Sequence, residues 1–176
     1  GVLVVPSFVE RNECDLFMMS ASDHIRQSSW KPHQKYARMR LPVASKLAAA
    51  HETCDAVIRR ALAFVETNSE LSTRLFGQAQ ALSEMGVTFA VGEPAVNVYR
   101  SGGEFPQHED GHMLTILVPL SPVGDFVDGG TAFWPTEASS EPFDEAAHDR
   151  ELLLVRDVTG PGLLLRLAAG TLILFV

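Results

Sequence analysis

The sequence has few cysteines, fewer basic than acidic residues and no long hydrophobic run. Cys14 and Cys54 are the two cysteines among 176 residues, and both lie in patterns typical of amphipathic helices, so we expect reduced thiols. The 14 Lys and Arg residues against 22 Asp and Glu give a net charge of −8, which argues against nucleic acids and anionic membranes as partners. No apolar run approaches the roughly 18 residues of a membrane helix, and Gly1–Val5 is too short and uncharged for a signal peptide.

The chain has enough hydrophobic residues for one sizeable core. They make up 46% of the sequence, and 176 residues correspond to one domain at roughly 150 residues per domain. We therefore expect a single domain over residues 1–176. Because the sequence lacks an initiator methionine and stops within an apolar run, we also expect it to be a piece of a longer protein with its C-terminal strand or strands missing.

Hydrophobic periodicity predicts mainly helices in the first half of the chain. Val2–Val5 is typical of an edge strand, and Glu10–Ala21 has the apolar spacing of a helix. A longer helix is predicted over Pro42–Val65. A second helix is predicted to follow it, with a capping box at Thr67 and a stop at Gly86.

The stretch His24–Arg40 differs from its neighbours in charge. It contains five basic residues, no acidic residue and no clear period. We expect a mobile, solvated loop here, with a lid over an acidic substrate as the less favoured alternative.

The period changes from 3.6 to 2 after Gly86, which predicts strands for the second half. Helices followed by short strands indicate an α+β chain, in which N-terminal helices buttress a sandwich or jelly-roll barrel. The predicted strands are Val96–Tyr99, Leu114–Leu120, Thr131–Trp134, Leu152–Val155, Leu163–Leu167 and Thr171–Val176.

The candidate site lies where this second half begins, at His108 and Asp110. Alternate side chains of an extended chain share a face, so an imidazole and a carboxylate two residues apart can bind the same metal ion. Together they supply two corners of the 2-His-1-carboxylate triad that binds Fe(II) and leaves positions open for substrate and O2. A His-x-Asp pair is common by chance, but Gly102 and Gly103 allow a sharp turn and Phe105 can seal a barrel mouth.

The window Tyr99-x-x-Gly102-x-x-Phe105-x-x-His108-x-Asp110 resembles the signature of the prolyl 4-hydroxylase-like Fe(II)/2-oxoglutarate dioxygenases. The resemblance extends over nearly the whole chain, from the opening strand and helix to Gly170–Phe175, which is similar to the seventh core strand of that family. It implies a double-stranded β-helix core and hydroxylation of a peptidyl proline, or less favourably lysine, with O2 consumed and succinate and CO2 released. The implied cofactors are Fe(II), 2-oxoglutarate and O2, with ascorbate as a further candidate, and the implied partner is a peptide or protein substrate.

The resemblance also implies roles for individual residues. His108 and Asp110 correspond to iron ligands and catalytic residues, Tyr99 to a residue that hydrogen-bonds 2-oxoglutarate, and Thr131 to a small residue near that cosubstrate. Alternation along the strand separately turns Ile116 and Val118 inward, where they contact the cosubstrate or simply pack in the core.

The chain departs from the family at its C-terminal end. The family's third iron ligand is a histidine a few residues beyond the seventh strand, and a Lys or Arg that binds the cosubstrate lies further on. We expect both beyond Val176. His112 is a candidate for lining the pocket, whereas His24, His33, His51 and His148 read as surface residues.

Two other functions stay open at this stage. A non-catalytic jelly-roll module that has lost cofactor binding would serve as a protein-interaction surface. A zinc-dependent hydrolase would use His108, Asp110 and His112, but no separate general base stands out for it. The sequence does not indicate a compartment or an oligomeric state.

Overall fold

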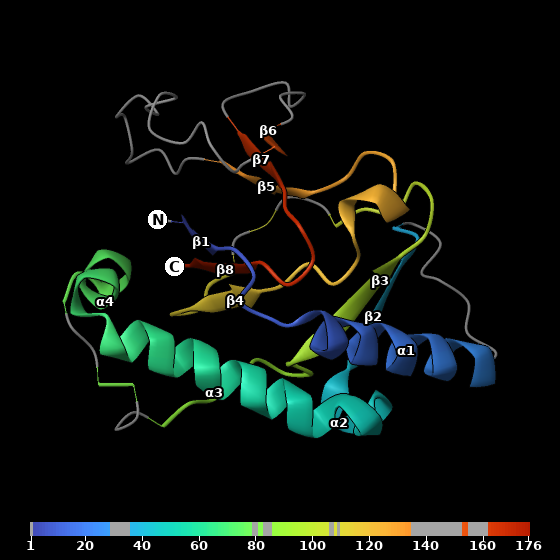
Figure 1. The fold of residues 1–176 in the computed structure, drawn as a ribbon, viewed down its shortest axis with the longest axis horizontal. Coiled ribbons are helices and arrows are strands. Elements are labelled where there is room, and N and C mark those ends of the chain that lie inside the picture. The colour runs from blue at the N-terminus through green and yellow to red at the C-terminus, as the bar shows by residue number, and fades with distance from the viewer. Residues whose placement is uncertain are drawn as a thin grey trace.

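A computed structural model describes residues 2–28, 36–78, 81–82, 86–105, 108, 110–134, 153–154 and 162–176. Helices dominate the first half of this part of the chain and strands the second half (Figure 1). The helices are α1 (Arg11–Gln27), α2 (Val43–Lys46), α3 (His51–Thr67) and α4 (Ser69–Phe76), with short 3-10 turns at Ala48–Ala50 and Val123–Asp125. The strands are β1 (Val2–Val5), β2 (Arg38–Pro42), β3 (Ala95–Tyr99), β4 (Thr115–Leu117), β5 (Thr131–Phe133), β6 (Leu153–Leu154), β7 (Leu163–Arg166) and β8 (Leu172–Phe175).

The described strands form small antiparallel sheets, none of which is closed. Their orders are β1-β8-β4, β5-β7-β6 and the two-stranded ribbon β2-β3. Strand β8 lies at the centre of its sheet, so that Phe175 is opposite both Val2 of β1 and Thr115 of β4. Its continuous apolar sequence fits this place, because a central strand covered on both faces needs hydrophobic residues at every position.

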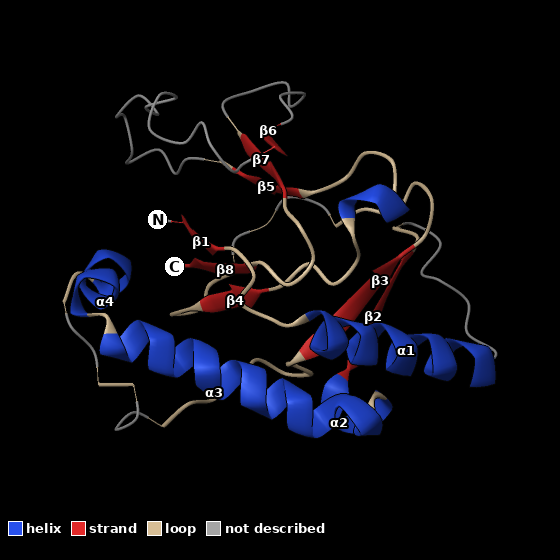
Figure 2. Cartoon of the chain, viewed as in Figure 1, coloured by secondary structure: helices blue, strands red, loops and turns tan. Residues whose placement is uncertain are grey.

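Helices α3 and α4 cover one face of the sheet β1-β8-β4, as Figure 2 shows. Leu172 and Leu174 of β8 are fully buried on that face. They pack against the apolar stripes of the two helices, which comprise Ala61, Val65, Leu71 and Leu75. The stripe at i, i+3 and i+4 that predicts these helices is therefore the surface that they bury.

The opposite face of the same sheet packs against the sheet β5-β7-β6. Ile173 of β8 is buried between the two sheets together with Leu165 of β7. Phe133 and Phe175 meet edge to face there, with ring centres 5.0 Å apart. The layers thus run from helices to sheet to sheet. The mixed helix-and-strand content is as predicted, while a closed double-stranded β-helix stays a prediction.

The ribbon β2-β3 has its own helical cover. Phe17 of α1 packs against Met39 and Leu41 of β2 and against Val96 of β3. Because side chains alternate along a strand, the other face of the ribbon carries Arg38, Arg40 and Tyr99 toward solvent.

The ends of the helices differ from the predicted ones. The stretch Pro42–Val65 is not one helix but α2, a 3-10 turn and α3. The N-cap of α4 is Asn68, whose Oδ1 accepts a hydrogen bond from the Leu71 N–H at 3.0 Å, whereas the Thr67 hydroxyl donates to the Ala63 carbonyl within α3. Helix α4 ends at Gly77, well before the predicted Gly86.

The basic stretch His24–Arg40 is not a loop throughout. Helix α1 continues to Gln27, and Arg38 and Arg40 belong to β2. The alternation of Arg38-Met39-Arg40-Leu41 is typical of a half-buried strand and was the signal for it. Residues 29–35 lie outside the described part of the chain.

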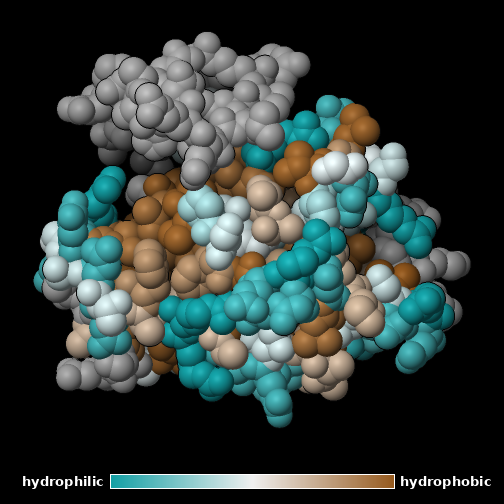
Figure 3. All heavy atoms as spheres, in the orientation of Figure 1, coloured by the Kyte–Doolittle hydropathy of each residue, from teal (hydrophilic) through white to brown (hydrophobic). Residues whose placement is uncertain are grey.

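Figure 3 shows a hydrophilic band across the region of α1 and α3, with hydrophobic residues gathered around β1. Cys14 and Cys54 are both buried and free.

Within the described part, no helix is both long and apolar enough to cross a membrane.

Candidate metal-binding site

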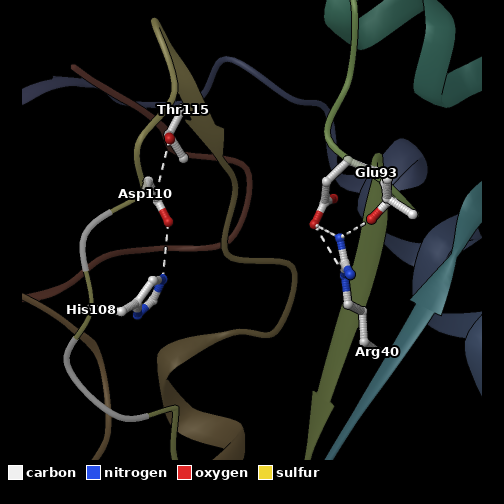
Figure 4. Close-up of polar contacts among 6 residues, drawn as sticks. Arg40, Glu93, His108, Asp110 and Thr115 are labelled. Carbon is white, nitrogen blue, oxygen red and sulfur yellow. Dashed lines mark hydrogen bonds and ion pairs between the residues drawn. The ribbon is translucent and has the colours of Figure 1, made fainter.

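The side chains of His108 and Asp110 meet in the loop that leads into β4. Nε2 of His108 lies 2.9 Å from Oδ1 of Asp110 (Figure 4). The two side chains are 43% and 29% exposed, so both remain reachable from solvent. The predicted pair is therefore adjacent in space as well as in sequence.

The place of the pair in the fold differs from the predicted one. The pair was expected on an extended strand, but β3 ends at Tyr99 and β4 begins only at Thr115. Gly111, with φ +48°, turns the backbone directly after Asp110. The pair therefore lies in the connection between β3 and β4 and outside both strands.

Thr115, the first residue of β4, holds the carboxylate in place. Its hydroxyl donates a hydrogen bond to Oδ2 of Asp110 at 2.9 Å, which leaves Oδ1 for the imidazole. Hydrogen bonds of this kind fix the orientation of metal-ligating carboxylates in proteins. Thr115 is anchored in turn by its pairing with Phe175 of the central strand β8.

The 2.9 Å between the two side chains is a direct hydrogen bond, and it is also close to the spacing of two ligands on one metal ion. Two ligand atoms that each lie about 2.1 Å from one ion, at right angles, are about 3 Å apart. The 2.9 Å between His108 Nε2 and Asp110 Oδ1 matches that separation. An imidazole nitrogen and a carboxylate oxygen are also the donor types of the Fe(II) triad.

An aromatic ring and a cation flank the pair. The ring of Phe105 lies against the imidazole of His108, with ring centres 4.1 Å apart, and the guanidinium carbon of Arg38 lies 3.6 Å from the centre of the Phe105 ring. The turn before Phe105 is tight, because a Cβ at Gly103 would lie 2.8 Å from the carbonyl oxygens of Ala37 and Arg100. The predicted sharp turn at this glycine is confirmed.

Tyr99 lies on the exposed face of the ribbon that carries Arg38. The two residues are directly opposite each other in the β2-β3 pairing, so their side chains share a face. Tyr99 is 46% exposed. The structure therefore brings Tyr99 next to Arg38, and Arg38 next to the ring that covers His108.

Ile116 and Val118 point elsewhere. Both pack against the cluster formed by α3, α4 and β8, on the helical side of the sheet. Their place agrees with the core-packing alternative, and contact with a cosubstrate stays a prediction. Thr131 pairs with Leu165 and shares a strand face with Phe133, which packs between the two sheets.

The described residues do not supply a third ligand. No group of three or more His, Cys, Asp or Glu side chains in this part of the chain is arranged to hold a metal ion. His112, the candidate for lining the pocket, is exposed, and His51 lies beside Asp55 on α3. His33 and His148 lie outside the described residues.

Comparison with protein-family models, with curated proteins and with solved structures gives no match for this chain.

Sequence reasoning missed two members of the site. The sequence predicts a solvated loop at Arg38, although the alternation of polar and apolar residues in Arg38-Met39-Arg40-Leu41 is typical of a half-buried strand. The sequence predicts Thr115 only as part of an apolar strand. Its hydroxyl is the feature that indicates a hydrogen bond at the edge of the site.

Proposed function

We propose that this chain is an Fe(II)- and 2-oxoglutarate-dependent dioxygenase. The observation that carries the proposal is the 2.9 Å contact between His108 Nε2 and Asp110 Oδ1, oriented by Thr115. The donor types and their separation suit two adjacent positions on one ion, and the resemblance of the Tyr99-to-Asp110 window supplies the choice of iron.

Each residue of the site has a part in this proposal. His108 and Asp110 would hold Fe(II), which with O2 and 2-oxoglutarate supplies the oxidising chemistry. Thr115 keeps the Asp110 carboxylate in the orientation that leaves Oδ1 toward His108. Phe105 shields one face of the imidazole from water, and the Tyr99 phenol donates a hydrogen bond to the cosubstrate.

The proposed reaction is hydroxylation of a peptidyl proline, with lysine as the less favoured residue. The resemblance supports this choice, since the family's prolyl and lysyl branches share the pattern around the His-x-Asp pair. The substrate is accordingly a peptide or protein, and ascorbate is a candidate for keeping the iron reduced. The proposal requires a third ligand that the described residues do not supply.

The test is an anaerobic titration of the longest natural form of the chain with Fe(II) and 2-oxoglutarate. A weak charge-transfer absorption that needs both components is expected, together with succinate formation when O2 is admitted. His108→Ala should abolish both signals, because it removes one of the two donors. His51→Ala, an exposed histidine on α3, serves as the matched control and should leave both unchanged.

A non-catalytic interaction module is the second candidate, favoured by the fact that only two donors converge among the described residues. It predicts no absorption band and no succinate from the full-length chain. Equal signals from His108→Ala and the unaltered protein would also reject the dioxygenase. The zinc-hydrolase alternative loses its third ligand, because His112 is exposed and joins no metal-holding group in the described part of the chain.

A further inference from the structure

Arg38 stands out among the arginines of the described chain because of its surroundings. Arg11, Arg26, Arg40 and Arg60 each pair with a carboxylate. Arg38, like Arg59, Arg74 and Arg166, forms no ion pair with any described acidic residue, and its guanidinium lies over the face of Phe105 beside the candidate site. A guanidinium that stacks on an aromatic ring keeps its N–H donors at the ring's edge, where they can bind another group.

The position of this guanidinium relative to the site is specific. The same aromatic ring, that of Phe105, contacts both this guanidinium and the imidazole of His108. Tyr99 is the direct partner of Arg38 across the ribbon, and its side chain shares the same exposed face. Side chains opposite each other on a ribbon have Cβ atoms about 5 Å apart, so a guanidinium and a phenol there can reach one common ligand.

We infer that Arg38, together with Tyr99, binds a carboxylate group of the molecule that occupies the His108–Asp110 site. Guanidinium binds carboxylate through two parallel N–H donors, and such charge-assisted hydrogen bonds are about twice as strong as neutral ones. Phe105 fixes the height of the guanidinium above the site, so the bound carboxylate lies beside the reacting centre. The inference rests on the proposed function for the identity of the ligand.

Two ligands of the proposed reaction carry this chemistry. One is 2-oxoglutarate, a dicarboxylate, and the other is a peptide substrate with an acidic side chain beside the proline. The overall charge of −8 repels either ligand. A local cation at the site would offset this repulsion for the bound carboxylate. Both ligands present the same group to Arg38, and a binding experiment separates them.

The chain offers a matched control at Arg40. It lies two residues along β2 on the same exposed face, but its guanidinium is already paired, with Nε 3.1 Å from Oε1 of Glu93 (Figure 4). Arg38→Gln and Arg40→Gln therefore remove the same charge from the same strand face. Arg38→Lys keeps the charge and removes the planar fork.

The experiment measures ligand binding by NMR on the longest natural form of the chain, without metal and with Zn²⁺ as a redox-inert ion. The probes are 2-oxoglutarate, a short peptide with glutamates flanking proline, and the same peptide with glutamines. The Arg38 Nε–H signal, assigned through Arg38→Gln, should shift in a saturable way with at least one acidic probe and not with the glutamine peptide. Arg38→Gln should weaken the binding of that probe about tenfold or more, and Arg38→Lys should weaken it less.

The outcomes separate the two ligand sources. If Arg38→Gln loses affinity for 2-oxoglutarate alone, the bound carboxylate belongs to the cosubstrate. If it loses affinity for the glutamate peptide alone, the carboxylate belongs to the substrate. Unchanged affinities in Arg38→Gln, or equal losses in Arg38→Gln and Arg40→Gln, would overturn the inference. Circular dichroism and the melting temperature check that each variant is folded.

The same measurements distinguish this inference from the proposed function. If Fe(II) produces no absorption band but Arg38 still governs carboxylate binding, the dioxygenase fails and the inference stands. If the band and succinate appear while Arg38→Gln binds every probe as the unaltered protein does, the inference alone fails.

Discussion

Glu13 of α1 and Arg60 of α3 form a two-pronged ion pair. Nη1 and Nη2 of Arg60 lie 3.1 Å and 2.7 Å from Oε1 and Oε2 of Glu13. The same carboxylate accepts the N–H of Glu10 at 2.8 Å, which closes the capping box at the start of α1. One side chain thus caps a helix and ties it to a second one.

This pair makes stability depend on pH. The hydrogen bond from Arg60 holds the pKa of Glu13 below its usual value, with the Glu10 N–H and the Arg60 charge acting in the same direction against burial. A lowered folded-state pKa contributes stability above the unfolded-state pKa, near 4.3, and that contribution is lost as pH falls through the folded value.

Glu13→Gln should therefore cost about 1 kcal/mol at pH 7, since Arg60 is 40% exposed and water screens the pair. Urea unfolding at pH 7 and at pH 3 measures the cost, which should shrink at the lower pH. Glu52→Gln, at an exposed position in the first turn of α3, is the control. A cost that stays the same at both pH values would contradict the ion-pair explanation.

Gly170 and Gly77 both need glycine for their backbone conformation, but only Gly170 also needs it for lack of space. Both have positive φ, +81° and +75°, but a Cβ at Gly170 would lie 2.2 Å from the Val9 carbonyl oxygen, whereas Gly77 has open space. Gly77→Ala should cost about 1 kcal/mol from backbone conformation alone. Gly170→Ala should cost at least about 3 kcal/mol, because the backbone must also move. Chemical denaturation of the two variants compares them, and equal costs would show that the turn before β8 can relax.

Thr115 should control metal affinity without binding metal. Thr115→Val removes the hydrogen bond to Asp110 Oδ2 and keeps the shape of the side chain, so Fe(II) should bind about tenfold more weakly. Thr115→Ser keeps the hydroxyl and should restore most of the affinity. Competition with a chelator under nitrogen gives the affinities. If the Val and Ser variants bind Fe(II) equally, the hydroxyl has no orienting role.

Cys54 should be inert in the folded protein. Burial raises the pKa of its thiol to about 11, helped by the negative charges of Asp55 and Glu93. At pH 8 the thiol stays protonated, so a Cys14→Ala variant should react with a disulfide reagent only as fast as the protein opens. Because the thiol ionises more easily in the unfolded chain, folding stability should fall as pH rises above about 9. Rapid labelling at pH 8 would show that this part of α3 opens readily.

The strands of the second half were predictable because each is short, apolar and bounded by turn residues. The predicted Val96–Tyr99 and Leu163–Leu167 match β3 and β7 closely. The run Leu114–Leu120 is longer than β4, since its last residues leave the sheet. Periodicity identifies such elements, but the pairing partner decides where the hydrogen-bonded part ends.

The helix ends were less predictable because neighbouring residues compete for the same role. Thr67 and Asn68 can both cap α4, and the Thr67 hydroxyl donates instead to the Ala63 carbonyl within α3, which leaves Asn68 as the cap. Gly77 and Gly86 can both end a helix, and the first one in the chain does so. Local propensity does not rank such alternatives.

The candidate pair was predictable from spacing, but its neighbours were not. His108 and Asp110 are two residues apart, and any tight local path brings them close. Arg38 reaches the site through β2-β3 pairing and a stack on Phe105, which are long-range contacts that one sequence does not reveal. Ile116 and Val118 were placed by alternation from His108, and Gly111 interrupts that alternation before β4 begins.

The pairing of β1 with β8 sets an order on folding. Val2 is opposite Phe175, so β1 waits for a partner strand that is synthesised much later in the chain. Closing so long a loop is entropically slow, and until then both the apolar β1 and the helical face that covers this sheet lack their partners. Nascent chains should therefore depend on chaperones until β8 emerges, and the ribbon β2-β3 with α1 is the part that can form earlier.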